Sequence, residues 1–179
     1  MVFLDISKAF DKVWHQGLLF KLKSFGIEGR LLCWFGSYLK YRKQRVVING
    51  QASSWFTTNA GVPQGSILGP ILFLIFINDM HLSVLSEMRL FADDSHLYDI
   101  SKNVNSSVVK INNDLALLEG WAKQWRVKFN PTKTIYMIFS RTGNTPDHPN
   151  VIFSGTILKE SKQHKNLGIV FHNQLSFVH

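Results

Sequence analysis

The sequence predicts an α+β fold in which a mainly antiparallel sheet packs on helices. Strand, helix and hairpin patterns follow one another irregularly along the chain, which is typical of that class. The 179 residues are 45% hydrophobic and 18% charged, as in a globular protein with a substantial core. No repeat, low-complexity tract or linker divides the chain. We therefore expect residues 1–179 to form one domain.

The first 41 residues predict one strand and two helices. The apolar stretch MVFL at residues 1–4 predicts a short strand that ends at Asp5. Leu18, Leu22 and Phe25 share helical spacing, and Gly26 is a suitable residue to end that helix. A second helix is expected at about residues 28–41.

The next segment predicts a hairpin followed by an apolar helix. QRVVING at residues 44–50 is expected to enter an Asn-Gly turn, with SSWFTT at 53–58 as its partner strand. GVPQG at 61–65 is rich in turn residues, and Ser66 is a candidate N-cap for a helix that ends at Ile77. Because that helix is apolar nearly all round, we expect it at the centre of the core.

The second half predicts a further hairpin, a long helix and short strands. MRLFADDSHLY at 88–98 is expected to form strand, turn and strand, and residues 104–125 an amphipathic helix. Three short strands are expected at 135–139, 151–153 and 166–171, and the polar loop 142–150 separates the first two.

The charge distribution indicates a polyanionic partner. The chain carries 20 Lys and Arg against 12 Asp and Glu, a net charge of +8. Residues 1–50 and 119–179 are basic, whereas residues 51–118 carry three basic and six acidic side chains. A simple nucleic-acid coat should be uniformly positive. Basic flanks around central carboxylates instead favour an enzyme that binds phosphates and metal cations together.

Other features exclude several classes of protein. No apolar run is long enough to span a bilayer, and the N-terminus lacks the pattern of a signal peptide. Cys33 is the single cysteine, so no internal disulfide or cysteine-built zinc site can form. We expect an intracellular protein, nuclear or cytoplasmic, without a membrane or disulfide partner.

Asp5, Asp93 and Asp94 are candidate ligands of a metal ion. All three lie beside apolar strand segments, where an unpaired carboxylate costs several kcal/mol, and a divalent cation would remove that penalty. The alternative is local turn chemistry at each position. Local sequence does not show that Asp5 and Asp93 meet in space.

Five sequence blocks stand out along the chain: FLDISKAFDKVWH at 3–15, GVPQGSILGPILFLIFINDM at 61–80, FADDSHLY at 91–98, WAKQWRVKFNPTKT at 121–134 and HKNLGIVF at 164–171. In this order they resemble the signature blocks of reverse transcriptases, specifically those of LINE-type, jockey-like retrotransposons without long terminal repeats. The resemblance implies an RNA-directed DNA polymerase with a right-hand palm. It implies an RNA template, a DNA primer and dNTPs as partners.

The resemblance also implies a metal centre. Asp5 and Asp93 would be the principal ligands of two Mg²⁺ ions, with Mn²⁺ as a substitute, and Asp94 would support them. In two-metal phosphoryl transfer the cations activate the primer 3′-hydroxyl and steady the triphosphate, so no His or Ser nucleophile is needed.

Further roles are implied residue by residue. Phe10 would exclude a ribose 2′-hydroxyl, or else it is a core aromatic. Gln64 and Gly65 would lie along the nucleotide and template, or form an ordinary turn. Lys133 would neutralise the pyrophosphate leaving group, or remain solvated.

Two other pairs of residues also carry implied roles. Leu167 and Gly168 resemble the turn that grips the primer, although a plain strand turn is the alternative. Trp121 and Trp125, one helical turn apart, would stack bases or, as we expect, pack in the core.

The chain departs from the family pattern at its ends. Sequence for most of the fingers, for an endonuclease domain and for a thumb is absent, so we expect a partial palm domain. The alternative function is a truncated remnant that binds nucleic acid without catalysis. A group II intron maturase is a third class, but no maturase region follows.

Overall fold

The computed structural model describes residues 1–140 and 146–174. The chain forms two compact units: Met1–Ser7 with the described residues from Asp79 onward, and Lys8–Asn78. The described helices include none that is long and apolar enough to cross a membrane.

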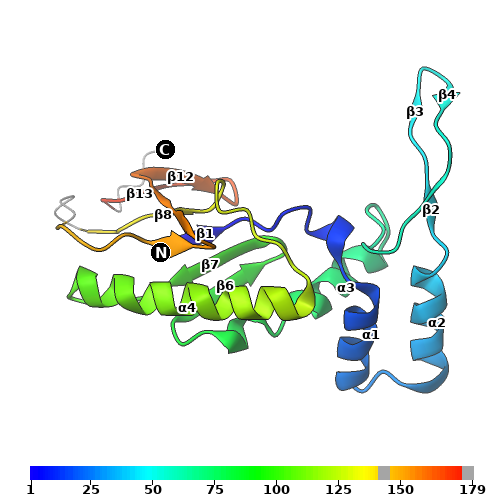
Figure 1. Cartoon of the computed structure of the whole chain (residues 1–179), viewed down its shortest axis with the longest axis horizontal. Helices are drawn as coiled ribbons and strands as arrows, with labels where there is room; N and C mark the ends of the chain where they lie inside the picture. Colours follow the sequence, from blue (N-terminus) through cyan, green and yellow to red (C-terminus); the bar gives the residue numbers. More distant parts are fainter. Residues whose placement is uncertain (141–145, 175–179) are drawn as a thin grey trace. The chain divides into compact units, whose positions relative to one another are not determined.

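A five-stranded sheet forms the centre of the first unit, in the order β11-β8-β1-β7-β6 (Figure 1). All neighbours are antiparallel except β11 and β8. This arrangement confirms a mixed α/β fold in which a sheet packs on helices. The strands are β1 (Val2–Leu4), β6 (Glu87–Phe91), β7 (Asp94–Tyr98), β8 (Ile135–Tyr136) and β11 (Lys159–Glu160).

The helix α4 (Val104–Trp125) covers one face of this sheet, at the bounds that the sequence predicted. Asn103 caps it by accepting hydrogen bonds from the backbone N–H groups of Asn105 and Ser106. Trp121 and Trp125 are buried, and the Trp121 indole donates to Asp79. Core packing of both tryptophans is thus confirmed.

A second hairpin packs on the other face of β1. Its strands β12 (Gln163–Asn166) and β13 (Ile169–His172) are antiparallel. The ring of Phe3 lies 4.5 Å from that of His164 and 6.1 Å from that of Phe171. The prediction of one strand over 166–171 was wrong, because Leu167 and Gly168 have positive φ angles and form the turn.

The remaining elements of the first unit are short. The strand predicted at 151–153 is found as β9, and part of the predicted loop 142–150 lies outside the described residues. These elements are η2 (Met80–Ser83), β9 (Ile152–Phe153) and β10 (Thr156–Ile157).

The second unit contains three helices and a hairpin. α1 (His15–Ser24) and α2 (Gly29–Leu39) are the two helices that the sequence predicted, and they lie side by side (Figure 1). α3 (Leu68–Ile77) buries Phe73 and Phe76 but leaves Ile71 and Leu74 about half exposed, so it is covered on one side only. A short helix, η1 (Phe10–Lys12), precedes α1.

The hairpin of the second unit spans residues 42–58 and projects away from α1 and α2 (Figure 1). Asn49 and Gly50 form its turn, as predicted, with φ angles of 50° and 79°. The pairing differs from the prediction next to the turn. There Val47 and Ile48 pair with Gln51 and Ala52, which precede the predicted partner strand 53–58. Its strands are β2 (Lys43–Gln44), β3 (Val47–Ile48), β4 (Gln51–Ala52) and β5 (Phe56–Thr57), paired β3 with β4 and β2 with β5.

Candidate active site

The register of β1 and β7 brings Asp5 close to Asp94. Leu4 is paired with Ser95 in this antiparallel ladder, so Asp5 and Asp94 are the next pair beyond it. Side chains alternate between the two faces of a strand. Phe3, Asp5, Asp94 and His96 therefore share the face that the β12–β13 hairpin covers, and the rings of Phe3 and His96 meet at 5.1 Å.

A polar cleft of about 180 Å³ opens on this face. Four predicted site residues line it: Asp5, Asp94, Lys133 and Leu167. Asp93 and Gly168 are chain neighbours of lining residues. Asp93 is exposed in the turn between β6 and β7, while Gly168 forms the β12–β13 turn. The remaining lining residues are Phe3, Leu4, Ser95, His96, His164, Lys165 and Asn166.

The backbone of Asp5 is held by the turn that follows Phe129. The Asp5 carbonyl accepts from the Asn130 N–H at 2.8 Å, and the Asp5 N–H donates to the Thr134 hydroxyl at 3.2 Å. That hydroxyl in turn donates to the Asn130 carbonyl at 2.9 Å. Thr134 is buried, so this arrangement fixes the end of β1 from which the Asp5 carboxylate projects.

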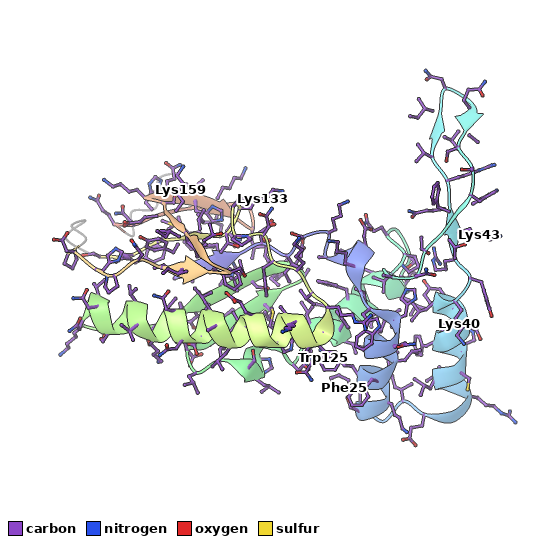
Figure 2. All side chains as sticks on the ribbon, in the orientation of Figure 1. Phe25, Lys40, Lys43, Trp125, Lys133 and Lys159 are labelled. Atoms are coloured by element: carbon purple, nitrogen blue, oxygen red, sulfur yellow. The ribbon has the colours of Figure 1, made fainter. Side chains whose placement is uncertain are left out.

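The same turn places Lys133 at the rim of the cleft. The side-chain oxygen of Asn130 accepts from both the N–H and the hydroxyl of Thr132, which closes a tight turn. Lys133 follows with its side chain exposed (Figure 2). Sequence analysis chose Lys133 but missed Asn130 and Thr134. The pattern Asn-Pro-Thr-Lys-Thr, typical of an Asx turn, was the available signal.

Two histidines, His96 and His164, also line the cleft. Burial lowers the pKa of His96, and the Asp94 carboxylate and the Asn166 side chain oppose this shift. Burial also lowers the pKa of His164, again opposed by Asp94. Both imidazoles are therefore biased toward the neutral form. His96 lies two residues beyond Asp94 on one strand, so the period of two was the signal that could have identified it.

The cleft combines groups of opposite charge. Asp5 and Asp94 supply oxygens suited to a divalent cation, whereas Lys133 and Lys165 supply ammonium groups suited to phosphate oxygens. Within residues 1–140 and 146–174, no three His, Cys, Asp or Glu side chains are grouped so that they could hold a metal ion by themselves. The carboxylates would need ligands from a substrate or water to complete a coordination shell.

The other predicted site residues lie in the second unit. Phe10 is half-buried and stacks on Phe73 with ring centroids 4.6 Å apart. Gln64 donates from its amide to the Asp11 carboxylate at 3.0 Å, and Gly65 has a φ of 79° in an exposed turn. Phe10 thus packs against an aromatic ring of α3, and Gly65 lies in a turn, as the structural alternatives for these residues predict.

Comparison with known proteins identifies the family. The family model for reverse transcriptase (RNA-dependent DNA polymerase) matches residues 1–171. The RNA-directed DNA polymerase from mobile element jockey of Drosophila melanogaster is 35% identical over 98% of this chain, and that of Drosophila funebris is also 35% identical. The probable RNA-directed DNA polymerase from transposon BS of Drosophila melanogaster is 34% identical over the same share.

The chain spans about a fifth of the length of these relatives, since it covers 20% of each. Its match to the family model nevertheless includes all five signature blocks. The chain belongs to the reverse transcriptase family, with relatives among the jockey-like polymerases of non-LTR retrotransposons, as those blocks predicted.

Proposed function

We propose that this chain is the palm region of an RNA-directed DNA polymerase that adds dNTPs to a primer 3′-hydroxyl on an RNA template. The main support is the register of β1 and β7, in which Asp5 and Asp94 follow the Leu4–Ser95 pair. Two carboxylates from distant parts of the sequence thereby line one cleft with Lys133. The proposed domain is partial, and the longer protein would supply the remaining fingers and the thumb.

The donor set fits divalent cations. Mg²⁺ is usually held by one or two carboxylates, with substrate phosphates and water as its other ligands. Asp5 and Asp94 meet that requirement, and Asp93 is the adjacent residue in the turn. In the proposed centre all three would hold two Mg²⁺ ions, which Mn²⁺ can replace. The bound cations supply charge neutralisation and lower the pKa of the primer hydroxyl.

The chain's own residues would position and neutralise the substrates. Lys133 would offset the negative charge of the departing pyrophosphate, and its place in the Asn130 turn keeps its backbone close to that of Asp5. Leu167 and Gly168 would hold the primer end at the rim of the same cleft.

Three residues of the second unit would contact the nucleotide and template. Phe10 would limit the space beside the sugar at its 2′ position, because its stack on Phe73 restricts the movement of its ring. Gln64 and Gly65 would lie along the base pair. The space beside the Gly65 Cα is open, and because glycine has no side chain a substrate could approach the backbone there.

Primer extension tests the proposal directly. The chain is mixed with poly(rA), oligo(dT), dTTP and Mg²⁺, and the product length is measured. We expect templated extension by the wild type and a loss of about 10³-fold or more in Asp93→Asn, because removal of one ligand weakens charge stabilisation in the transition state. Asp147→Asn is the matched control, since it changes the same charge at an exposed position.

Metal binding provides a second measurement that does not require turnover. We expect Mn²⁺ binding, followed by electron paramagnetic resonance, to weaken in Asp5→Asn and to persist in Asp147→Asn. Equal Mn²⁺ affinity in both variants, or extension by Asp93→Asn at the wild-type rate, would contradict the proposed centre. RNA binding without extension or Mn²⁺ binding would instead identify a non-catalytic remnant.

A further inference from the structure

We propose that the β2–β5 hairpin and the cleft at its base, here called the basic arm (residues 42–64), bind single-stranded RNA. This inference rests on the proposed function, because an RNA-copying enzyme must hold the unpaired template. It adds a binding surface that is carried by the second unit alone, and residues 42–60 of its hairpin lie outside the five signature blocks.

The charge of the basic arm and its surroundings favours a polyanion. Residues 29–78 contain no Asp or Glu, and their cations are Arg30, Lys40, Arg42, Lys43 and Arg45. Three of these five lie within four residues at the start of the hairpin. Lys40 and Lys43 are labelled near the end of α2 and the base of the hairpin in Figure 2. A local field of one sign attracts phosphates and accelerates association.

The cleft at the base of the hairpin provides space for a nucleic-acid backbone. Its volume is about 650 Å³, and Lys8, Lys12, Arg42 and Lys43 contribute to its lining. Asp11 is the one acidic residue in this lining, and its carboxylate accepts a hydrogen bond from Gln64. The four cationic side chains of the lining therefore outnumber its single carboxylate, and the cleft has a net positive charge.

Exposed aromatic rings lie on the same hairpin as the cations. Trp55 is 58% exposed and Phe56 is 66% exposed. The Arg45 guanidinium lies 4.6 Å from the centre of the Trp55 ring. Exposed aromatic rings beside cations are the combination with which proteins hold single-stranded nucleic acid, because bases stack on the rings and phosphates are neutralised nearby.

The backbone of the basic arm presents these groups in a defined arrangement. The Thr58 N–H donates to the Arg42 carbonyl at 2.8 Å, and the Ser53 N–H donates to the Val46 carbonyl at 2.9 Å. With the ladder pairs between β2 and β5, these bonds place Lys43 opposite Thr57 and Gln44 opposite Phe56. A paired hairpin loses less conformational entropy on binding than an unstructured basic segment.

The ligand is inferred to be single-stranded because stacking on Trp55 and Phe56 requires bases with accessible faces. Bases within a duplex already stack on each other, so aromatic side chains gain little from them. The combination of a cationic cleft with exposed rings thus favours an unpaired strand over a double helix.

Fluorescence anisotropy with labelled U20 RNA tests this inference on the whole chain, without Mg²⁺ or dNTPs. We expect the pair Lys43→Gln and Arg45→Gln to weaken binding about tenfold at 0.1 M salt. The slope of log affinity against log salt should become shallower by about 1.4, because each contact to a single strand contributes about 0.7. The control pair Lys23→Gln and Lys123→Gln removes the same charge from exposed sites on α1 and α4.

Trp55 gives an independent measurement. We expect Trp55→Ala to weaken U20 binding about fivefold or more, with the salt slope unchanged, because stacking does not release counterions. Trp55→Phe should retain most of the affinity. Ultraviolet crosslinking followed by mass spectrometry should attach U20 to Trp55 or Phe56. Thermal unfolding monitored by circular dichroism confirms that each variant is folded.

Two results would overturn the inference. One is an equal loss of affinity in the arm pair and the control pair, which would indicate non-specific attraction. The other is a dimer, seen by sedimentation, that Trp55→Ala dissociates while U20 binding is unchanged, which would assign the surface to a second copy of the chain. Arm-dependent RNA binding without primer extension would contradict only the proposed function, and primer extension together with the equal loss of U20 affinity in the two pairs would contradict only this inference.

Discussion

Two hairpins of this chain, β6–β7 and the hairpin of the basic arm, close in the same way but are stabilised differently. Both have a two-residue turn with positive φ, at Ala92 in the β6–β7 hairpin and at Asn49 and Gly50 in the basic arm. β6 and β7 join a five-stranded sheet covered by α4, whereas within the described part of the chain the strands of the arm pair with each other alone. Similar turns thus occur in a hairpin that is built into a larger sheet and in a hairpin whose strands are exposed.

The largest expected difference between the hairpins lies in their apolar residues. Leu97 of β7 is fully buried, and Val47 of β3 is 56% exposed. We expect Leu97→Ala to lower the free energy of unfolding by about 2–5 kcal/mol, because it removes buried methyl groups and leaves a cavity. Val47→Ala should change it by about 0.5 kcal/mol or less. Urea denaturation measures both, and equal effects would contradict the difference in burial.

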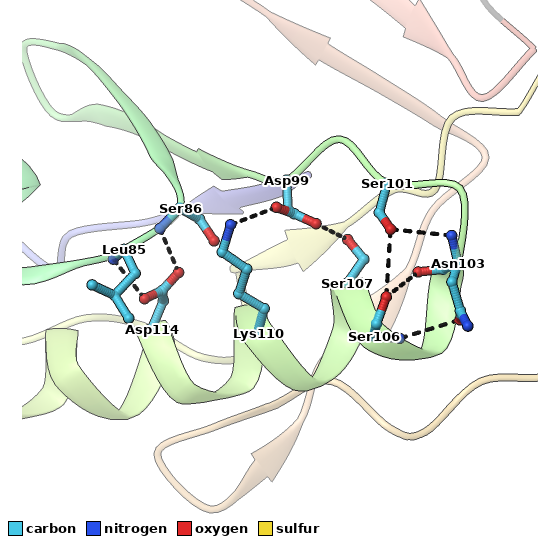
Figure 3. A network of polar contacts seen from close by, with 9 residues as sticks. All are labelled: Leu85, Ser86, Asp99, Ser101, Asn103, Ser106, Ser107, Lys110 and Asp114. Carbon is cyan, nitrogen blue, oxygen red and sulfur yellow. Dashed lines mark hydrogen bonds and ion pairs between the residues drawn. The ribbon is translucent and has the colours of Figure 1, made fainter.

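A second feature of the β6–β7 hairpin is an anchor supplied by α4. Asp114 of α4 is fully buried, and its carboxylate accepts from the N–H groups of Leu85 and Ser86 just before β6 (Figure 3). We expect Asp114→Ala to destabilise the chain by about 2–3 kcal/mol, since two N–H groups lose a charged acceptor. Asn113→Ala, at an exposed neighbouring position, is the control for helix propensity. A similar small effect of both substitutions in urea denaturation would contradict the anchoring role.

A third test concerns how firmly the candidate catalytic carboxylate is positioned. Thr134→Val keeps the side-chain volume but removes the hydroxyl that accepts from the Asp5 N–H. We expect a loss of about 1–2 kcal/mol in stability and weaker Mn²⁺ binding. Thr134→Ser keeps the hydroxyl and should retain Mn²⁺ affinity. Weakened binding in Thr134→Ser but not in Thr134→Val would exclude this positioning role.

Local pattern predicted much of the fold. The 3.6-residue period identified α1, α2 and α4, and the Asn-Gly pair at 49–50 identified the turn of the arm. Burial was harder to predict. The apolar composition of α3 suggested a helix at the centre of the core, yet Ile71 and Leu74 are exposed because the described elements cover only one side. Coverage depends on neighbours that are remote in sequence.

The candidate site was predicted in part, for a related reason. Family blocks selected Asp5, Asp94, Lys133 and Leu167, which line one cleft. The contacts of Asn130 and Thr134 with Asp5 span more than 120 residues, and no local pattern contains such pairings. The roles of Phe10, Gln64 and Gly65 remain predictions, as do the metal-binding roles of the three aspartates.

The turns of the two hairpins also differ in backbone strain, with a smaller expected effect on stability. Ala92 has a φ of 52°, a region that costs an L-residue about 1 kcal/mol, whereas Gly50 has a φ of 79° at little cost. We expect Ala92→Gly to stabilise the chain by up to about 1 kcal/mol and Gly50→Ala to destabilise the arm by a similar amount. Thermal unfolding measures the first, and amide hydrogen exchange across residues 42–58 measures the second. Changes of the same sign would contradict this assignment of strain.

The smallest expected effect is a pH dependence at the end of β7. Hydrogen bonding from the Lys110 ammonium at 2.8 Å lowers the pKa of Asp99 below its ordinary value, and the Ser107 hydroxyl contributes in the same direction (Figure 3). Because the folded-state pKa lies below 3.8, the unfolded chain binds the proton more tightly. Asp99 therefore stabilises the fold at pH values above 3.8, and this contribution is lost as the pH falls through the folded-state pKa.

We expect Asp99→Asn to be less stable than the wild type at pH 6 and to show a smaller further loss on acidification below pH 4. Stability curves by urea denaturation at pH 6, 4 and 3 measure this, with Asp147→Asn as an exposed control. Parallel curves for Asp99→Asn and the wild type would mean that the contact between Asp99 and Lys110 does not stabilise the end of β7. The difference between the two hairpins would then depend on apolar burial and on the contacts of Asp114.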